Sequence, residues 1–133
     1  MKISWISQHD PTPSQRAELT RLFGPHVLDV DMSPFADAAE IARRIRRTDA
    51  QEVVCIAPLS VLQKLTSFGI RPLNATMDRC DPAEAEVVTG NPPRHYKFRK
   101  FRRLVGIEMS YEEIPPTAPG LPKENGNGTT RKF

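Results

Sequence analysis

Apolar and polar positions change their spacing in a regular way along the first eighty residues. Short apolar runs rich in β-branched residues are typical of strands, and apolar positions three or four residues apart predict helices. On this basis we expect strands over residues 2–7, 26–31, 52–57 and 70–77, and helices over residues 13–23, 37–47 and 58–68. Because strands and helices alternate with connections of a few residues, the pattern predicts an α/β fold with a parallel sheet covered by helices.

The helix boundaries carry local signals of their own. Thr12 fits an N-cap, Pro13 fits the first helical position, and Gln15 completes a Thr-x-x-Gln capping box. Gly69 is a typical stop for the third helix. The run EVVCIA at 52–57 is almost continuously apolar, as expected for a strand buried on both faces. Residues 1–80 are therefore predicted to form a small Rossmann-like core with the order βαβαβαβ.

The character of the chain changes after residue 80. Residues 83–90 and 94–114 alternate like strands, and the Gly-Asn-Pro-Pro sequence at 90–93 is typical of a hairpin turn. We expect residues 81–114 to form a basic β-hairpin or short meander that extends or caps the sheet within the same domain. Residues 115–133 are rich in Pro, Gly and Asn and predict a disordered tail.

Composition narrows the class of protein only slightly. The chain has 133 residues, a net charge of +3 and an isoelectric point near 9.1, which alone is too little to indicate a nucleic-acid ligand. Cys55 and Cys80 do not suggest a disulfide framework, and no Cys/His spacing typical of a metal site occurs. No signal peptide or membrane span is evident at the N-terminus, so we expect a cytoplasmic protein. From the missing metal and cofactor motifs we expect no metal and no cofactor.

Candidate chemistry gathers where the predicted parallel strands end. Ligands of open α/β sheets bind at the carboxyl ends of the strands, beside helix N-termini. Three segments qualify, and they are expected to converge: Ser7, Gln8, His9, Asp10 and Thr12 after the first strand, Pro58, Leu59 and Ser60 after the third, and residues 76–79 with Arg79 after the fourth.

These residue types suit a phosphate-bearing ligand. A histidine is the side chain best suited to act as a general acid or base at neutral pH, and His9 could take that role. Ser7, Thr12 and Ser60 offer hydroxyls, and Arg79 offers a fork for phosphate oxygens. Neither GxGxxG nor GxxxxGK[ST] occurs, which argues against a dinucleotide or P-loop enzyme.

Each of these residues also has a purely structural interpretation. His9 could be a local hydrogen-bonding group, and Asp10 could only shape the turn before Pro11. Thr12 could serve only as a cap, Ser60 could only open a helix, and Arg79 could belong to an ion pair.

Residues 94–103, RHYKFRKFRR, form a second candidate site. Six of the ten are Lys or Arg, and Tyr96, Phe98 and Phe101 lie between them. Basic residues interleaved with aromatics are typical of a surface for single-stranded nucleic acid. A hairpin with a buried aromatic face and a solvated basic face explains the same residues. A third interpretation makes this strand a positively charged wall of the His9 site.

The order of these pieces resembles small accessory proteins of type III CRISPR systems. Those compact Rossmann-like chains open with a strand ending in Ser-x-His or Ser-His, continue with Thr-Pro-x-Gln, and close with a segment like GIRPLNATM. The matching residues here are Ser7, His9, Thr12, Pro13 and Gln15, followed by residues 57–59 and 69–76. The hairpin over residues 82–114 and the Gln8-His9-Asp10 spacing depart from the smallest members.

The resemblance implies a homodimer that binds a cyclic oligoadenylate and cleaves it as a metal-independent ring nuclease, or only binds it. It implies that His9 assists proton transfer and Ser7 contributes at the catalytic centre. The residues expected to hold the ligand are Gln8, Asp10, Thr12, Pro58, Leu59, Ser60, Arg79, Arg94, Lys97 and Arg99. Two alternatives stay open: an accessory protein that binds RNA or DNA through residues 94–103, and a protein that only binds or inhibits another protein.

Overall fold

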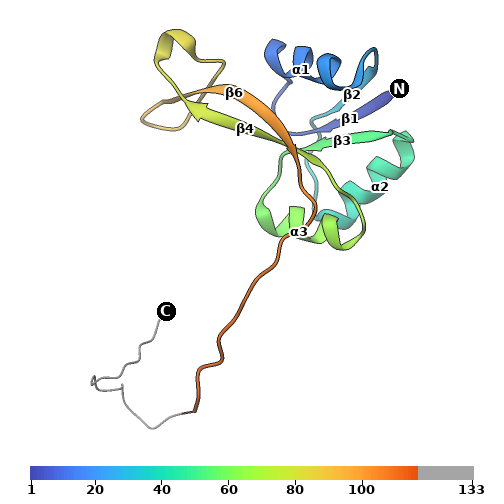
Figure 1. The fold of residues 1–133 in the computed structure, drawn as a ribbon, viewed down its shortest axis with the longest axis vertical. Coiled ribbons are helices and arrows are strands. Elements are labelled where there is room, and N and C mark those ends of the chain that lie inside the picture. Colours follow the sequence, from blue (N-terminus) through green and yellow to red (C-terminus); the bar gives the residue numbers. More distant parts are fainter. Residues whose placement is uncertain (117–133) are drawn as a thin grey trace.

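The computed structural model describes residues 1–116 and confirms the alternation of strands and helices expected for the first eighty (Figure 1). The elements are β1 (Lys2–Ile6), α1 (Pro13–Phe23), β2 (Val27–Asp31), α2 (Ala38–Thr48), β3 (Glu52–Cys55), α3 (Leu59–Ser67) and β4 (Leu73–Arg79). They are followed by a single 3₁₀ turn, η1 (Pro82–Glu84), and by β5 (Val87–Thr89) and β6 (Arg94–Arg103).

All six strands belong to one sheet in the order β2-β1-β3-β4-β6-β5. The first four strands run parallel, whereas β6 lies antiparallel between β4 and β5. The sheet is therefore mixed, and the expectation of a parallel sheet holds only for β1 to β4. The turn at 90–93 reverses the chain as expected, and β6 extends the sheet by pairing along the whole of β4.

Both strands of the hairpin are shorter than the alternation suggested. Pro82 opens η1, so that β5 begins only at Val87. β6 ends at Arg103 rather than at residue 114. The Leu104 N–H still donates to the Pro72 carbonyl in the register of β4, and beyond this bond Leu104 and Ile107 pack against the core. Apolar residues after position 103 thus pack against the core instead of continuing a strand.

Helices cover both faces of the parallel part of the sheet (Figure 1). On one face, Leu19 of α1 packs with Trp5, Val54 and Leu73. On the other face, α2 and α3 cover Ile6, Val53 and Cys55. Burial raises the pKa of the Cys55 thiol to about 12, and neither cysteine forms a disulfide in the described residues.

The three helices begin in different ways. Thr12 and Gln15 form the predicted capping box of α1, and the Asp37 carboxylate accepts the Glu40 N–H at the start of α2. Pro58 precedes α3 and offers no side-chain cap. The first turn of α3 is therefore the one whose amides remain uncapped by a side chain.

The tail predicted over residues 115–133 lies almost entirely outside the described residues, because the description ends at residue 116. Within residues 1–116, no helix combines the length and apolar content needed to cross a bilayer.

Candidate functional site

The sheet has a topological switch point between its neighbouring strands β1 and β3. From β1 the chain moves to β2 on one side, and from β3 it moves to β4 on the other. Helix α1, which follows β1, covers one face and α3, which follows β3, covers the opposite one, so the loops that leave β1 and β3 part from each other. Such a divergence opens a crevice at the carboxyl ends of the strands, which is where open α/β sheets bind ligands.

A hollow of about 470 Å³ lies at this place. Its lining comes from the three loops that follow β1, β2 and β3: Ser7, Gln8, His9, Pro34, Phe35, Ile56, Ala57 and Pro58. The volume falls in the range of small-molecule sites, and the lining combines apolar surface with a few polar groups, as such sites do. The sequence-predicted segments after the first and third strands therefore do meet.

Ser7 and His9 have different surroundings within this lining. Ser7 is 3% exposed, and its Oγ accepts the backbone N–H of His9 at 3.1 Å. The indole Nε1 of Trp5 donates to the His9 carbonyl at 3.0 Å. The His9 backbone is thus held from two sides while its side chain stays exposed at the hollow. An exposed imidazole on a fixed backbone suits proton exchange with a ligand.

Ser7 already has structural hydrogen bonds. Its N–H donates to the carbonyl of Asp31 at 3.3 Å, and its Oγ serves as the acceptor for His9. The hydroxyl proton remains able to donate into the hollow. The main role of Ser7 is therefore to stabilise the turn after β1, and contact with a ligand would be an additional role.

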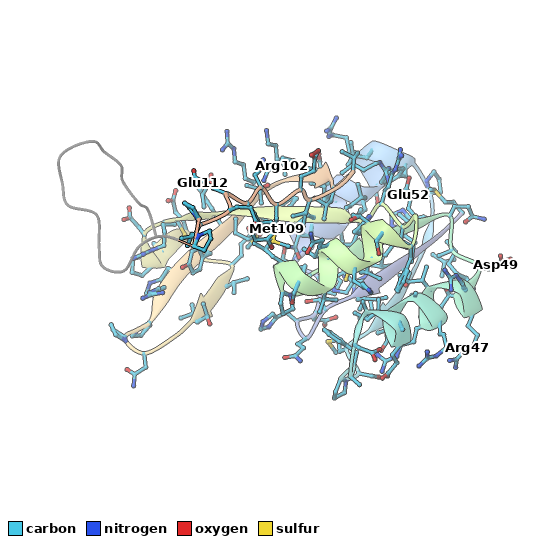
Figure 2. The ribbon with its side chains drawn as sticks, turned by 90° about the horizontal axis from the view of Figure 1, so that it is seen from below. Arg47, Asp49, Glu52, Arg102, Met109 and Glu112 are labelled. Atoms are coloured by element: carbon cyan, nitrogen blue, oxygen red, sulfur yellow. The ribbon has the colours of Figure 1, made fainter. Side chains whose placement is uncertain are left out.

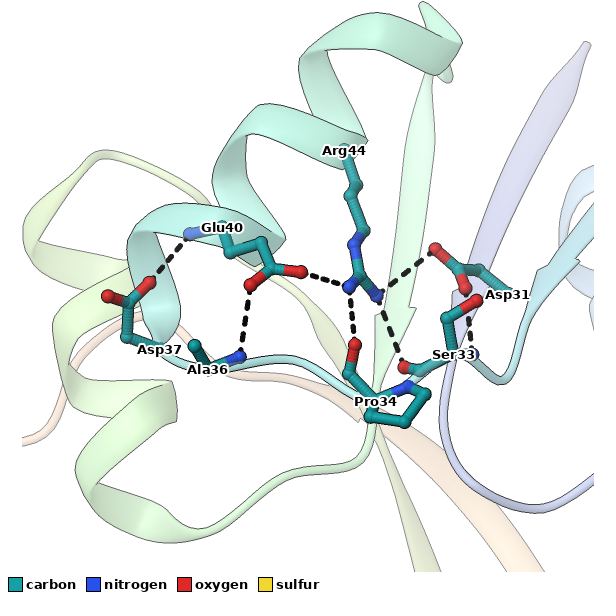
Figure 3. A network of polar contacts seen from close by, with 7 residues as sticks. All are labelled: Asp31, Ser33, Pro34, Ala36, Asp37, Glu40 and Arg44. Atoms are coloured by element: carbon teal, nitrogen blue, oxygen red, sulfur yellow. Dashed lines mark hydrogen bonds and ion pairs between the residues drawn. The ribbon is translucent and has the colours of Figure 1, made fainter.

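The wall that carries Pro34 and Phe35 is held by Arg44 of α2 (Figure 3). The Arg44 guanidinium donates to the carbonyls of Ser33, at 3.1 Å, and Pro34, and it pairs with the carboxylates of Asp31, at 3.5 Å, and Glu40. Four contacts to one rigid fork fix the loop between β2 and α2.

The carboxylates in this network titrate below their ordinary range. Burial would raise the pKa of Asp31, but the hydrogen bonds from Ser33 and the charge of Arg44 outweigh it and lower that pKa. The pKa of Glu40 is lowered by the backbone N–H of Ala36 and by Arg44. Both groups are therefore charged at neutral pH, and Arg44 is occupied by them.

The start of α3 supplies the remaining polar groups. Among the described residues, the backbone amides of Leu59 and Ser60 have no hydrogen-bond acceptor, and they directly follow Pro58 in the hollow's lining. The side chains of Leu59 and Ser60 are exposed but do not line the hollow. Free amides at a helix N-terminus attract anions.

Two of the residues predicted after the first strand lie outside the hollow. Thr12 is buried in the capping box of α1, which matches its structural interpretation. Asp10 is exposed and lies 3.8 Å from Arg16 of the same helix. Phe35 was missed from the sequence. The signal was present, since the loop after the second predicted strand also ends at the carboxyl edge of the sheet.

The predicted cationic residues do not line this hollow. Arg79 lies over the ring of Tyr96 at 5.8 Å, and Lys97 pairs with Glu84 at 3.7 Å. Arg94 and Arg99 belong to β6, two strands away from β3. The predicted segment at residues 76–79 does not converge with the other two. It belongs to the part of β4 that extends beyond the parallel strands and pairs with β6.

The register of β6 places its three aromatic residues on one side, together with Arg94 and Arg103, and three of its other cations on the opposite side. Tyr96 and Phe98 face the side of α1, and a bulge at Thr76/Met77 places Phe101 on that side too. Phe101 lies 4.8 Å from Phe98 and 6.4 Å from Trp5, measured between ring centroids. Lys97, Lys100 and Arg102 face the opposite side.

Within residues 1–116, no group of three or more His, Cys, Asp or Glu side chains is placed to hold a metal ion. Comparisons of the chain with models of protein families, with curated proteins and with solved structures returned no match.

Proposed function

We propose that the hollow between the loops after β1, β2 and β3 binds a phosphate-bearing nucleotide ligand of the cyclic oligoadenylate type, and that His9 assists its cleavage. The observation that carries this proposal is the meeting of an exposed imidazole, an aromatic side chain and a helix start without a side-chain cap in one hollow. Phe35 offers a surface for a base, the amides of Leu59 and Ser60 suit a phosphate, and His9 suits proton transfer.

The topology supports the same ligand class. The order β2-β1-β3-β4 of the parallel strands is that of flavodoxin-like doubly wound sheets, in which a nucleotide binds at the β1/β3 switch point. We therefore propose a Rossmann-like parallel core for β1 to β4, extended by the antiparallel strands β6 and β5.

The proposed reaction needs only groups of the ligand and one proton carrier. A ribose 2′-hydroxyl attacks the neighbouring phosphorus, its proton leaves, and the P–O5′ bond breaks to give a 2′,3′-cyclic phosphate and a 5′-hydroxyl. His9 takes up or returns a proton, and the amides at α3 stabilise the charge that develops on phosphate oxygens. A hollow of about 470 Å³ holds only part of such a ring, which supports a homodimer with two hollows facing one ligand.

A His9→Ala variant tests this proposal, with His95→Ala as the matched control, because His95 lies on β6 away from the hollow. The wild-type protein and the control are expected to bind and cleave cyclic tri-, tetra- or hexa-adenylate in the presence of EDTA. His9→Ala is expected to bind with similar affinity but to cleave about 10²-fold more slowly. If the wild-type protein binds none of the three rings, the proposed function is wrong.

Phe35→Ala separates binding from chemistry. Loss of the stacking surface is expected to weaken affinity for the ring by about 10-fold, equivalent to about 1.4 kcal/mol, while the cleavage rate at saturating ligand stays unchanged. Isothermal titration calorimetry and single-turnover cleavage measure the two quantities. An unchanged affinity would place the ligand elsewhere.

One observation favours nucleic-acid binding as a second candidate function. Arg99, Lys100 and Arg102 are exposed and make no ion pair among the described residues. Because the aromatic side chains of β6 face the other side, these cations would contact phosphates rather than frame stacked bases. Binding to a single-stranded oligonucleotide should then fall steeply with salt and be lost in a Lys100→Glu/Arg102→Glu variant, with His9→Ala without effect.

A further inference from the structure

The chain after β6 forms an extended arm, residues 104–116, that leaves the body of the protein beside α3 (Figure 1). Residues 105–112 alternate: Val105, Ile107, Met109 and Tyr111 are apolar, and Glu108, Ser110 and Glu112 are polar. Met109 is 58% exposed and Tyr111 is 82% exposed. An alternating pattern on an extended, unpaired segment is typical of a strand that lacks its partner.

The arm cannot pair with its own β6. Leu104 donates its N–H to Pro72, the Ile107 carbonyl accepts from Gln63 Nε2 at 3.4 Å, and both side chains pack against the core. These contacts direct the arm past α3, on the opposite side of the sheet from α1 (Figure 1). Among residues 1–116, the arm therefore has no strand partner within its own molecule.

One edge of the sheet has the matching vacancy. β5 pairs only with residues 94–96 of β6, so within the described residues 1–116 the backbone of residues 99–103 has no neighbouring strand on the side away from β4. Exposed edges of this kind accept an added strand through main-chain hydrogen bonds.

Charge and side-chain pattern both match between the arm and this edge. The arm carries Glu108, Glu112 and Glu113 and no Lys or Arg, whereas residues 99–103 of β6 carry four Lys or Arg, of which Arg103 is paired with Glu52. An added strand with alternating apolar and acidic residues would continue both sides of β6, placing apolar beside aromatic residues and Glu beside Lys100 and Arg102.

The opposite edge of the sheet does not match. β2 presents Asp29 and Asp31 at that edge, and like charges across neighbouring strands destabilise their pairing. The free part of β6 is therefore the favoured acceptor for an acidic strand.

We propose that the arm of one molecule adds as a strand to the free edge of β6 in a second copy of this chain, and that the second copy does the same in return. The exchange gives a symmetric dimer in which each acidic arm covers the basic edge of its partner. This assembly does not depend on the ligand proposed for the hollow.

Charge reversal tests the exchange on the full chain. The first variant, Glu108→Lys/Glu112→Lys, has a basic arm. The second, Lys100→Glu/Arg102→Glu, has an acidic edge. Arg46→Glu/Arg47→Glu on α2 is the matched control, because Arg47 lies at the far end of the molecule from Arg102 and Glu112 (Figure 2). Sedimentation equilibrium from low micromolar to sub-millimolar concentration gives the mass.

The wild-type protein and the control are expected to be dimers, and each charge-reversed variant alone is expected to have about half that mass. An equimolar mixture of the two variants is expected to form a heterodimer, because each basic segment then meets an acidic one. A monomeric wild-type protein, or a variant that stays dimeric alone, overturns the proposal. It is equally overturned if reversal at Lys100 and Arg102 abolishes oligonucleotide binding and leaves the mass unchanged.

Discussion

At the scale of single residues, Ser7 connects the fold to the candidate site. Its buried Oγ accepts the His9 N–H, so Ser7→Ala leaves a backbone donor without its partner. We expect this variant to lower the free energy of unfolding by about 1 kcal/mol, measured by urea denaturation. Ser60→Ala removes an exposed hydroxyl and should change it by no more than about 0.5 kcal/mol. Equal effects of the two variants would contradict the role given to Ser7.

The two thiols provide a second test at this scale. Cys55 is fully buried, and desolvation raises the pKa of its thiol to about 12, whereas Cys80 is half-exposed. Native protein treated with iodoacetamide at mildly alkaline pH is expected to be modified at Cys80 first, and Cys55 only after unfolding. Peptide mass spectrometry identifies the modified residue, and early labelling of Cys55 would show that β3 is accessible.

Residue-level predictions from the sequence succeeded where the cause is local. Thr12 and Gln15 are three residues apart, so the capping box could be recognised without knowledge of the fold. The placement of Arg79 could not, because it depends on the register between β4 and β6. Phe35 lines the hollow because Arg44 holds the residues just before it in place. No short sequence motif indicates these contacts of Arg44.

At the scale of elements, Arg44 joins α2 to the loop after β2. Arg44→Met keeps much of the side chain's apolar length but removes the fork, and we expect it to lower the free energy of unfolding by about 2 kcal/mol at neutral pH. Arg46→Met, at an exposed position of the same helix, is the control and should have little effect. Chemical denaturation monitored by circular dichroism measures both.

The effect of Arg44→Met should depend on pH in a definite direction. The pKa values of Asp31 and Glu40 lie below their ordinary values of 3.8 and 4.5. Their contribution to stability is therefore complete above those ordinary values and is lost as the pH falls through the lowered ones. The difference between wild-type protein and Arg44→Met is expected to shrink in acid. A difference that stays constant down to pH values well below the ordinary range would show that these carboxylates do not stabilise the loop through their charge.

The elements of the first eighty residues could be predicted because hydrophobic spacing and caps are local. The direction of β6 was indicated by its turn, but its end was not, since Leu104 and Ile107 fit the strand pattern equally well. Their contacts with the core, rather than any change in the sequence pattern, end the strand. The periodicity of a sequence indicates which apolar side chains are buried but not which part of the molecule they pack against.

At the scale of the whole molecule, the contact between Trp5 and Phe101 joins the parallel and antiparallel parts of the sheet. Phe101→Ala is expected to lower the free energy of unfolding by about 3 kcal/mol, because it opens a void against the buried indole. Amide hydrogen exchange should accelerate in β1 as well as in β6. Val88→Ala, at an exposed position of β5, is the control. Acceleration confined to β6 would show that β6 unfolds independently of the parallel strands.

The indole that donates to the His9 carbonyl belongs to the chain's single tryptophan. It is 1% exposed, yet its polar edge is bonded to the loop that lines the hollow. Any ligand that shifts this loop must lengthen or reorient that hydrogen bond, and indole emission responds to such a change. The protein therefore carries an intrinsic fluorophore at the back of its candidate site, so unlabelled ligands can be screened by fluorescence before their chemistry is known.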